Sequence, residues 1–383
     1  MSMPFARVRV LGWQVADDRI RRGPRSAANR VFFPIETTVL ANYSGAQEVA
    51  LSAPPQTEFR RPSRILRLIG YGLSLICLVW VLHDIHPARA VRDFAGVDWK
   101  WVALGMGFDV VSYFVQAVRW KFLLTPFERV RLPNTVRAVF AGLFANLVFP
   151  LRPGELLRTY LISNSEDVTF GRVLGSVGVE RLIDLVIATA SLAVVSLFVD
   201  LPRRFKRAAD TMGIVALVLL AILVGIIFVL ELRLGEQEYL EKPQRNPGKL
   251  MGALISLHAM GTSPSFYPAV LFSVLMPFMQ VLALWSMMRA YAVPLSFLAS
   301  VVVLLVINIG VSLPNAPANV GSYQFFCVLG LSVFQIDKTT AAGFSIFAFL
   351  ALTLPIALVG FAAIFRSGLS VRSMRQIFRP SES

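Results

Sequence analysis

Long, uninterrupted apolar runs dominate the hydrophobic pattern after the first 63 residues of the chain. Two of the clearest are "ILRLIGYGLSLICLVWVL" (Ile65 to Leu82) and "MGIVALVLLAILVGIIFVL" (Met212 to Leu230). Each is close to the ~20 residues that an α-helix needs to cross a bilayer. The pattern predicts membrane-spanning helices at about 65–82, 101–124, 171–199, 212–231, 266–289, 294–313 and 339–365.

Two further apolar pieces, at about 136–165 and 314–336, are interrupted by proline. Proline removes a backbone donor and ends or kinks a helix. Backbone freed in this way survives at membrane depth only where protein or a water-filled cavity covers it. We therefore predict an all-α, polytopic helical membrane protein with about 7–8 transmembrane helices and two proline-broken or re-entrant segments. The predicted helix breaks are Pro150, Pro153, Pro314 and Pro317.

The two broken pieces resemble each other. In the first, Asn146 precedes Pro150 and Pro153, and Gly154 follows; in the second, Asn308 precedes Pro314 and Pro317, and Gly321 follows. A polar loop at 233–249 separates the two halves of the membrane part. Interrupted segments at corresponding positions are typical of the substrate site in inverted-repeat transporters. The match is short, so an inverted repeat and a coincidence both stay open.

Composition and charge agree with a membrane protein. Of the 383 residues, 56% are hydrophobic and 16% are charged, against about 25% charged residues in soluble domains. The net charge of +14 comes from basic residues at helix ends, as the positive-inside rule requires. We expect a multi-pass protein of the bacterial inner (plasma) membrane and no nucleic-acid partner.

Three regions follow from this pattern. Residues 1–63 are expected to form a polar, disordered N-terminal extension, residues 64–366 the membrane domain, and residues 367–383 a basic cytoplasmic tail. Cys77 and Cys327 lie in apolar runs and are interpreted as small core residues. His83 and His86 are interpreted as loop residues, so neither a metal site nor a cofactor is expected.

Charged residues inside the apolar runs are the candidate functional residues, because a charge at mid-bilayer costs about 2.5–3.5 kcal/mol on insertion scales. On the second predicted span, Asp109, Ser112, Gln116 and Arg119 follow at spacings of three, four and three. This spacing places them on one helical face, which should turn toward the bundle interior. Arg119 has a second interpretation, as an anchor at the membrane interface.

Another charged group is Glu180, Arg181 and Asp184 in "SVGVERLIDL". Two interpretations of it stay open: an internal ion pair that locks helices together, and contact with a polar substrate.

The stretch "LRPGELLRTYL" raises a similar choice. A helix that restarts at Gly154 offers backbone N–H groups to an anion, and Arg152 and Arg158 add guanidinium donors. Glu155 lies in the first helical turn and can pair with Arg158. These residues are either a site for a phosphate, with Glu155 near an adjacent amine, or charges that hold the break closed.

At these residues the chain resembles the lysylphosphatidylglycerol synthase transmembrane-region family, also called flippase-like domain proteins, which includes the membrane half of the bacterial multiple peptide resistance factor. The matching pieces are "AVRWKFLL", "NLVFPLRPGELLRTYLI" and "SVGVERLIDL". The resemblance implies that Arg152, Gly154, Glu155 and Arg158 form a first motif and that Glu180, Arg181 and Asp184 form a second. It also implies movement of phospholipids or lipid-linked precursors between leaflets.

The second half departs from the family pattern. Family members usually show Pro-Gly-Gly-x-Gly-x-x-Glu, whereas this chain has "PANVGSYQ", with Asn319 at a glycine position and Gln324 in place of the acid. The chain also lacks a soluble aminoacyltransferase half: the residues after 366 are too few for a catalytic domain, so we do not expect lipid aminoacylation from this chain.

Three functions stay open at this point. The first is binding and translocation of an anionic phospholipid or a lipid-linked precursor, with a path that adds Asp109, Arg119, Asn146, Asn308, Asn319 and Gln324 to the two motifs. The second is a membrane-embedded transferase that acts on a lipid-linked substrate, although no recognisable catalytic constellation supports an enzyme. The third is a non-catalytic membrane partner of a separate synthase.

Overall fold

The computed structural model of the protein describes most of residues 64–366. Within that range it leaves out 84, 151, 167, 313, 314, 226–257 and scattered positions between 200 and 224. The predicted N-terminal extension (1–63), the predicted tail (367–383), most of the predicted span at 212–231 and the predicted break at Pro314 lie outside the described residues.

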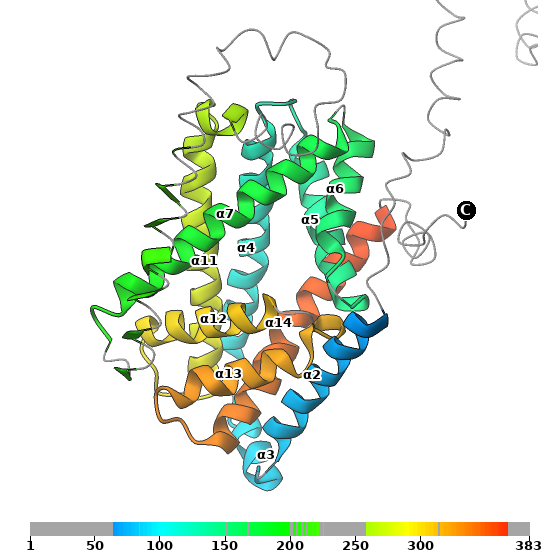
Figure 1. Cartoon of the computed structure of the whole chain (residues 1–383). Coiled ribbons are helices and arrows are strands. Elements are labelled where there is room, and N and C mark those ends of the chain that lie inside the picture. Colours follow the sequence, from blue (N-terminus) through cyan, green and yellow to red (C-terminus); the bar gives the residue numbers. More distant parts are fainter. Residues whose placement is uncertain are drawn as a thin grey trace, which may run out of the picture. The chain divides into compact units, whose positions relative to one another are not determined.

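The described residues form helices and connecting turns, which confirms the predicted all-α polytopic class (Figure 1). The elements are α2 (Arg64–Leu82), α3 (Pro87–Ala95), α4 (Trp99–Leu124), α5 (Leu132–Val148), α6 (Gly154–Ser165), α7 (Phe170–Val195), α11 (Phe266–Ala290), α12 (Phe297–Ser312), the 3-10 turn η1 (Pro317–Asn319), α13 (Ser322–Ser332) and α14 (Lys338–Arg366). Among them, α4, α11 and α14 are long and apolar enough to cross a membrane. The short amphipathic helix α3 was not predicted, because Pro87 starts it inside what the sequence presents as a polar loop.

Helices α5 and α6 form the first hairpin. α5 leaves the end of the molecule where α4 finishes, the chain reverses at Pro150 and Pro153, and α6 returns to the same end (Figure 1). With 17 and 12 residues, the arms are about 25 and 18 Å long, less than the ~30 Å hydrocarbon core of a bilayer. The first predicted broken piece is therefore re-entrant.

Glycine allows the two arms of the first hairpin to approach closely. A Cβ on Gly142 of α5 would lie 2.6 Å from the carbonyl oxygen of Gly154, and a Cβ on Gly154 would collide with the carbonyl oxygen of Gly142. At the open end of the hairpin, Glu166 accepts hydrogen bonds from the side chain of Asn134 (2.6 Å) and the backbone N–H of Arg131 (3.2 Å). The hairpin is thus closed by glycine contact near its tip and by a carboxylate at its base.

Helices α12 and α13 form the second hairpin, with η1 at its tip. α12 has 16 residues, or about 24 Å, and packs against α13 through Gly330, where a Cβ would lie 3.2 Å from the Cα of Val303. The segment predicted as a span at 294–313 is therefore the first arm of a hairpin. The hydrophobic pattern did not show this, because both arms are apolar and the reversal depends on contact between them.

The chain repeats this arrangement. Helices of 26, 17, 12 and 26 residues (α4, α5, α6, α7) are followed by helices of 25, 16, 11 and 29 residues (α11, α12, α13, α14). α5 packs on α14 and α12 packs on α7, so each hairpin contacts the last helix of the other half. These exchanged contacts indicate two structurally equivalent halves.

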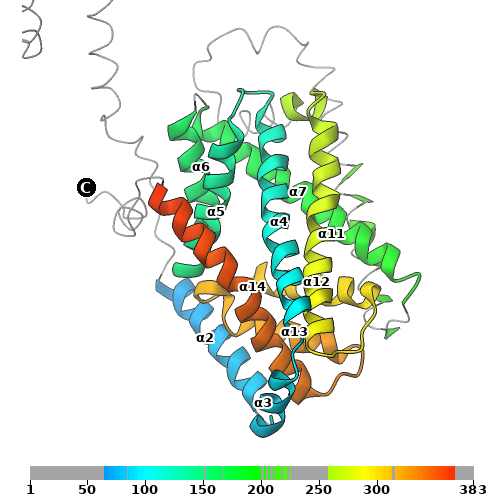
Figure 2. The same ribbon diagram turned by 180° about the vertical axis from the view of Figure 1, so that it is seen from behind.

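The two halves have opposite directions. Near the start of α4, Gly105 lies against Ala283, Ser286 and Met287 near the end of α11. Near the end of α4, Phe122 stacks on Phe272 near the start of α11, with ring centroids 5.8 Å apart. α4 and α11 are therefore antiparallel and lie side by side in both views (Figure 2). Because each hairpin starts where its preceding long helix ends, the two hairpins enter from opposite ends of the molecule, which is the geometry of an inverted repeat.

Candidate functional site

The centre of the candidate site is an ion-pair network, here called the inner network, formed by Arg119, Arg158 and Glu180. These three side chains come from α4, α6 and α7 and are buried. Glu180 pairs with Arg119, pairs with Arg158 (Nη2 to Oε2, 2.8 Å) and accepts a hydrogen bond from Gln116 (2.9 Å). The face predicted on α4 is confirmed, because Asp109, Ser112, Gln116 and Arg119 are all buried.

Trp120 packs against the inner network. The guanidinium of Arg158 lies 4.7 Å from the centre of the Trp120 ring, and the indole N–H donates to the hydroxyl of Ser176 (3.0 Å). A cation over an indole ring is attracted by its π electrons. The network therefore joins three helices, and the interpretation of Arg119 as an interfacial anchor is wrong.

A second group, here called the outer cluster, consists of Glu155, Arg181 and Asp184. Arg181 pairs with Glu155 and with Asp184 (3.4 Å), and the three side chains are 36%, 48% and 29% exposed for Glu155, Arg181 and Asp184. Asp184 also pairs with Arg119, so the outer cluster continues directly into the inner network. The charged residues thus form one chain from the protein interior to its outer surface.

The partner of Glu155 lies on another helix. The spacing allows Glu155 to pair with Arg158, three residues further along α6, but Glu155 pairs with Arg181 on α7. Arg158 instead turns inward to Glu180. The reason is burial: Arg158 lies on the packed face of α6, whereas Glu155 is part-exposed.

Apolar side chains flank the outer cluster on α7. Leu182 and Leu185, next to Arg181 and Asp184 in the chain, are 36% and 39% exposed. Leu174, two turns earlier on the same helix, is also exposed. A polar patch beside exposed leucines suits a molecule that has both a charged and an apolar part.

The tip of the first hairpin is closed by its own residues. The side chain of Asn146 accepts a hydrogen bond from the backbone N–H of Gly154 (2.7 Å), so this amide, expected to be free for an anion, is already satisfied. Arg152 has a left-handed backbone (φ 55°) and donates to the carbonyl oxygen of Val311 on α12 (2.9 Å). Arg152 therefore joins the two hairpins, at the end of a helix where a cation is favourable.

The candidates of the second half act mainly within the second hairpin. Gln324 is buried and accepts a hydrogen bond from the backbone N–H of Gly321 (2.7 Å), which caps α13. Asn319 has a left-handed backbone within η1, the turn that Pro317 begins. Asn308 is exposed on α12.

Sequence reasoning missed several residues that hold this second tip. Asn315 donates to the carbonyl oxygens of Gly310 and Val311 (3.2 Å each) and accepts from Ser322 (2.6 Å). The hydroxyl of Ser74 on α2 accepts from the backbone N–H of Ala316 (3.0 Å). Asn315 stands between the two prolines Pro314 and Pro317, and that position is the signal that would have identified it.

Asp109 lies apart from both charged groups. It is ten residues from Arg119 on α4, or about 15 Å along the helix. Its side chain is buried, and within the described part of the chain its Oδ2 atom has no hydrogen-bond partner. The structure therefore does not bring Asp109 into the ion-pair network.

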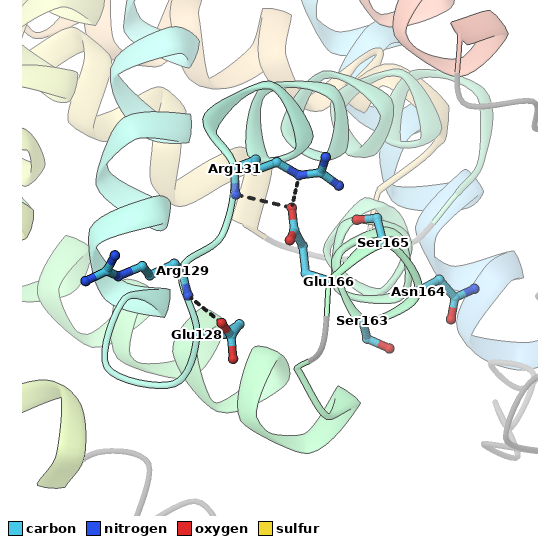
Figure 3. Close-up of a pocket in the computed structure, with 7 residues that line it drawn as sticks. All are labelled: Glu128, Arg129, Arg131, Ser163, Asn164, Ser165 and Glu166. Atoms are coloured by element: carbon cyan, nitrogen blue, oxygen red, sulfur yellow. Dashed lines mark hydrogen bonds and ion pairs between the residues drawn. The ribbon is translucent and has the colours of Figure 1, made fainter. Parts of the chain in front are cut away.

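An open hollow of about 400 Å³ lies at the base of the first hairpin (Figure 3). It is lined by Glu128, Arg129, Arg131, Ser163, Asn164, Ser165 and Glu166. Figure 3 shows Glu166 turned toward Arg131, the contact that closes the base of the hairpin. In the described residues there is no group of three His, Cys, Asp or Glu side chains that could hold a metal ion.

Two inverted halves, each with a re-entrant hairpin, define a multi-pass membrane protein with an internal polar network. Comparison with known families gives the same class. The sequence model of the lysylphosphatidylglycerol synthase TM region matches residues 67–360, and the chain belongs to this family.

Two archaeal relatives match over most of their length. A UPF0104 membrane protein of Methanothermobacter thermautotrophicus is 21% identical over 290 residues, covering 70% of this chain and 85% of the relative. A UPF0104 membrane protein of Methanocaldococcus jannaschii is 22% identical over 297 residues, covering 73% and 87%. The glycosyltransferase AglD of Haloferax volcanii is 26% identical over 123 residues, which are 32% of this chain and 20% of that enzyme.

Proposed function

We propose that the protein binds the polar headgroup of a phospholipid or a lipid-linked precursor at the outer cluster and moves the lipid between leaflets. The observation that carries this proposal is the position of Arg181 and Glu155, both part-exposed, directly beside the exposed leucines of α7. A headgroup phosphate would take the place of Glu155 on Arg181, while the acyl chains stay against Leu182 and Leu185.

The cost of moving a headgroup explains why such a site is needed. Moving an ion from water into hydrocarbon costs many kcal/mol of free energy unless protein groups replace the water molecules that solvate it. Arg181 and Asp184 supply charged partners at the surface, and Asp184 leads from them to Arg119. The two re-entrant hairpins support the proposal, because paired interrupted segments in inverted halves are where transporters bind their substrates.

The inner network has a different role in this proposal. Arg119, Arg158 and Glu180 are buried and paired with one another, so they hold α4, α6 and α7 together around the site. A headgroup phosphate that approaches Asp184 competes with this carboxylate for Arg119 and thereby reaches the edge of the network.

Lipid transfer in reconstituted vesicles tests the proposal. Purified protein in vesicles with a fluorescent phospholipid in both leaflets is treated with a membrane-impermeant quencher, and the protected fraction is followed over time. Wild-type protein should transfer the lipid to the accessible leaflet. The double variant E155Q/R181Q should be about tenfold slower or worse, because hydrogen bonds to charged groups contribute about 1.5–3 kcal/mol each.

The control is a second exposed ion pair, Arg89–Asp337 (3.3 Å), which links α3 to the start of α14. The double variant R89Q/D337N should transfer lipid at the wild-type rate. Equal rates for wild-type protein and E155Q/R181Q, or no protein-dependent transfer with anionic, zwitterionic and lipid-linked probes, would rule the proposal out.

The partial match to a glycosyltransferase favours a second candidate, a membrane region that presents a lipid-linked substrate to a transferase. The same outer cluster would bind the substrate phosphate. Product formation by the purified protein with lipid-phosphate sugar donors would support this candidate, and product without lipid transfer would favour it over the first.

We further propose that the protein lies in the bacterial plasma membrane and works with membrane lipids, supplied where needed by a separate synthase. The family and its apolar helices support a membrane location. Fractionation of cells that carry a tagged protein checks the location, and enrichment of the tag in any other fraction would contradict it.

A further inference from the structure

Asp109 is an acidic side chain that the proposed headgroup site does not use. It lies in the middle of α4, is 6% exposed, and its Oδ2 atom has no hydrogen-bond partner among the described residues. The hydroxyl of Ser112 donates to the backbone carbonyl of Asp109 (2.7 Å) and not to its carboxyl group. A buried carboxylate without partners is costly, so a carboxyl group at this position needs an explanation.

Two tyrosines lie near Asp109, and two further polar groups lie near one of them, Tyr113. Tyr113 on α4 and Tyr323 on α13 both lie close enough to feel its charge. α11 contributes Gln280, whose side chain hydrogen bonds with Tyr113. The tip of the first hairpin contributes Arg152, which lies within charge range of Tyr113.

Neither of the nearby cations is free to neutralise Asp109. Arg119, about 15 Å away along α4, is held by Glu180 and Asp184. Arg152 is held by the carbonyl oxygen of Val311. A carboxyl group at this position that carries a proton is neutral and needs no cation beside it.

Polar groups also connect Asp109 with the outer cluster. Tyr113 lies within charge range of both Asp109 and Arg152, and Arg152 in turn lies within charge range of Glu155 and Arg181. This series passes through the tip of the first hairpin, where the two halves of the molecule touch. A change of charge at Asp109 would thus be felt at the contact between the hairpins.

We propose that Asp109 is a proton-binding site whose loading controls the contact between the two hairpin tips during lipid movement. An O–H bond forms at Oδ2 with a proton from water on one side of the membrane, and the same bond breaks when the proton leaves to water on the other side. With the proton bound, Arg152 stays on Val311; with the proton released, Arg152 turns toward the carboxylate and the tips separate. The coupling to lipid movement rests on the proposed function, whereas proton binding does not.

Infrared spectroscopy of the purified protein tests proton binding directly. A protonated carboxyl group has a C=O stretching band that a carboxylate lacks. Wild-type protein should show this band at neutral pH, where exposed Asp side chains are ionised, and D109N should lack it. D98N is the matched control, because Asp98 is an exposed acid that caps the start of the same helix and Asn caps equally well.

Lipid transfer under a pH gradient tests the coupling. A gradient across the vesicle membrane should change the wild-type and D98N transfer rates by about fivefold or more, as coupling free energies of 1–3 kcal/mol give. D109N should transfer lipid at a rate that the gradient does not change. If wild-type protein moves no lipid, the proposed function fails, and the infrared band still decides whether Asp109 binds a proton.

Two results would overturn the inference. One is a spectrum of wild-type protein with no Asp109-dependent carboxyl band between about pH 5 and 9. The other is a pH-gradient response in D109N equal to that of wild-type protein. If D109N fails to fold, wild-type protein grown with carbon-13-labelled aspartate is measured instead, since only a protonated Asp gives an isotope-shifted carboxyl C=O band at neutral pH; absence of that band would overturn the inference.

Discussion

The guanidinium of Arg152, at the tip of the first hairpin, donates a hydrogen bond to the carbonyl oxygen of Val311, at the end of α12 in the second hairpin (2.9 Å). These residues are 159 positions apart in the chain. The contact places a cation at the negative end of a helix, on a carbonyl group that also accepts a hydrogen bond from Asn315 (3.2 Å). It is therefore a direct link between the two inverted halves.

Replacing Arg152 with Gln should weaken this link. The loss of a charged hydrogen bond to a part-buried carbonyl group should lower the free energy of unfolding by about 1.5–3 kcal/mol. Denaturant unfolding of the purified protein in detergent measures the change. R129Q, which alters an exposed arginine at the base of the first hairpin, should be close to neutral; equal stability of R152Q and wild-type protein would contradict a stabilising role for this contact.

A methyl group at Gly154 should push the arms of the first hairpin apart. In G154A the new Cβ collides with the carbonyl oxygen of Gly142 and lies 2.7 Å from Oδ1 of Asn146. Both are fixed in place, so we expect a loss of stability of about 2 kcal/mol or more, in the upper part of the range for single substitutions. Thermal unfolding in detergent checks this.

Gly171, near the start of α7, is the matched control for Gly154. A Cβ there meets nothing within 4 Å, and alanine is favoured over glycine in a helix by about 0.5–1 kcal/mol. G171A should therefore be as stable as wild-type protein or slightly more stable. A destabilised G171A together with an unaffected G154A would show that the hairpin arms do not approach as described.

Removing the charge of Glu180 should disrupt the inner network. E180Q leaves the buried guanidinium groups of Arg119 and Arg158 with less opposite charge. Breaking a buried ion pair from one side costs about 3–5 kcal/mol, so the yield of folded protein should fall sharply. Size-exclusion chromatography in detergent measures the folded fraction.

The triple variant R119M/R158M/E180L removes all three charges of the inner network at once. It therefore shows whether E180Q is harmful because it leaves buried arginines unpaired or because the network itself is needed for folding. Apolar side chains of similar volume often replace a buried ionic group without loss of stability. We expect this variant to recover folded protein relative to E180Q. If E180Q alone folds as well as wild-type protein, the inner network has no structural role.

Stability at acid pH should depend on Asp337, which precedes α14. Partial burial of Asp337 raises the pKa of its carboxyl group. Hydrogen bonds from Thr340 and Thr339 and the positive charge of Arg89 outweigh this effect, so the pKa is lowered overall. A lowered folded-state pKa means that the stabilisation is complete above the unfolded pKa of about 3.9 and is lost as the pH falls through the folded value. Thermal unfolding between about pH 6 and 3 should show a smaller acid-induced loss in D337N than in wild-type protein; parallel curves would contradict this.

The sequence predicted the outline of the fold and the location of the charges. The spacing of Asp109, Ser112, Gln116 and Arg119 gave the buried face of α4, and Pro150 and Pro153 gave the reversal between α5 and α6. These features are local: they depend on helical periodicity and on the missing donor of proline. They can therefore be read from a short stretch of chain.

The partners of the charges could not be predicted in the same way. Arg119 pairs with Glu180, 61 residues away, and Glu155 pairs with Arg181, 26 residues away. These pairs depend on how α4, α6 and α7 cross, which is decided by contacts between helices. The first arm of the second hairpin, α12, was predicted as a full span for the same reason, since the approach of Gly330 to Val303 is invisible in the hydropathy of either arm.

The two hairpins share their dimensions but not their chemistry. α5 and α6 carry Arg137, Glu155 and Arg158, whereas α12 and α13 contain no Asp, Glu, Lys or Arg. Two hairpins of similar dimensions that enter from opposite ends therefore make the molecule electrostatically asymmetric: one end carries a charged hairpin and the other an uncharged one. If the proposed function holds, a lipid headgroup would find ionic partners on one hairpin and only uncharged ones on the other, so the two directions of movement would not be equivalent.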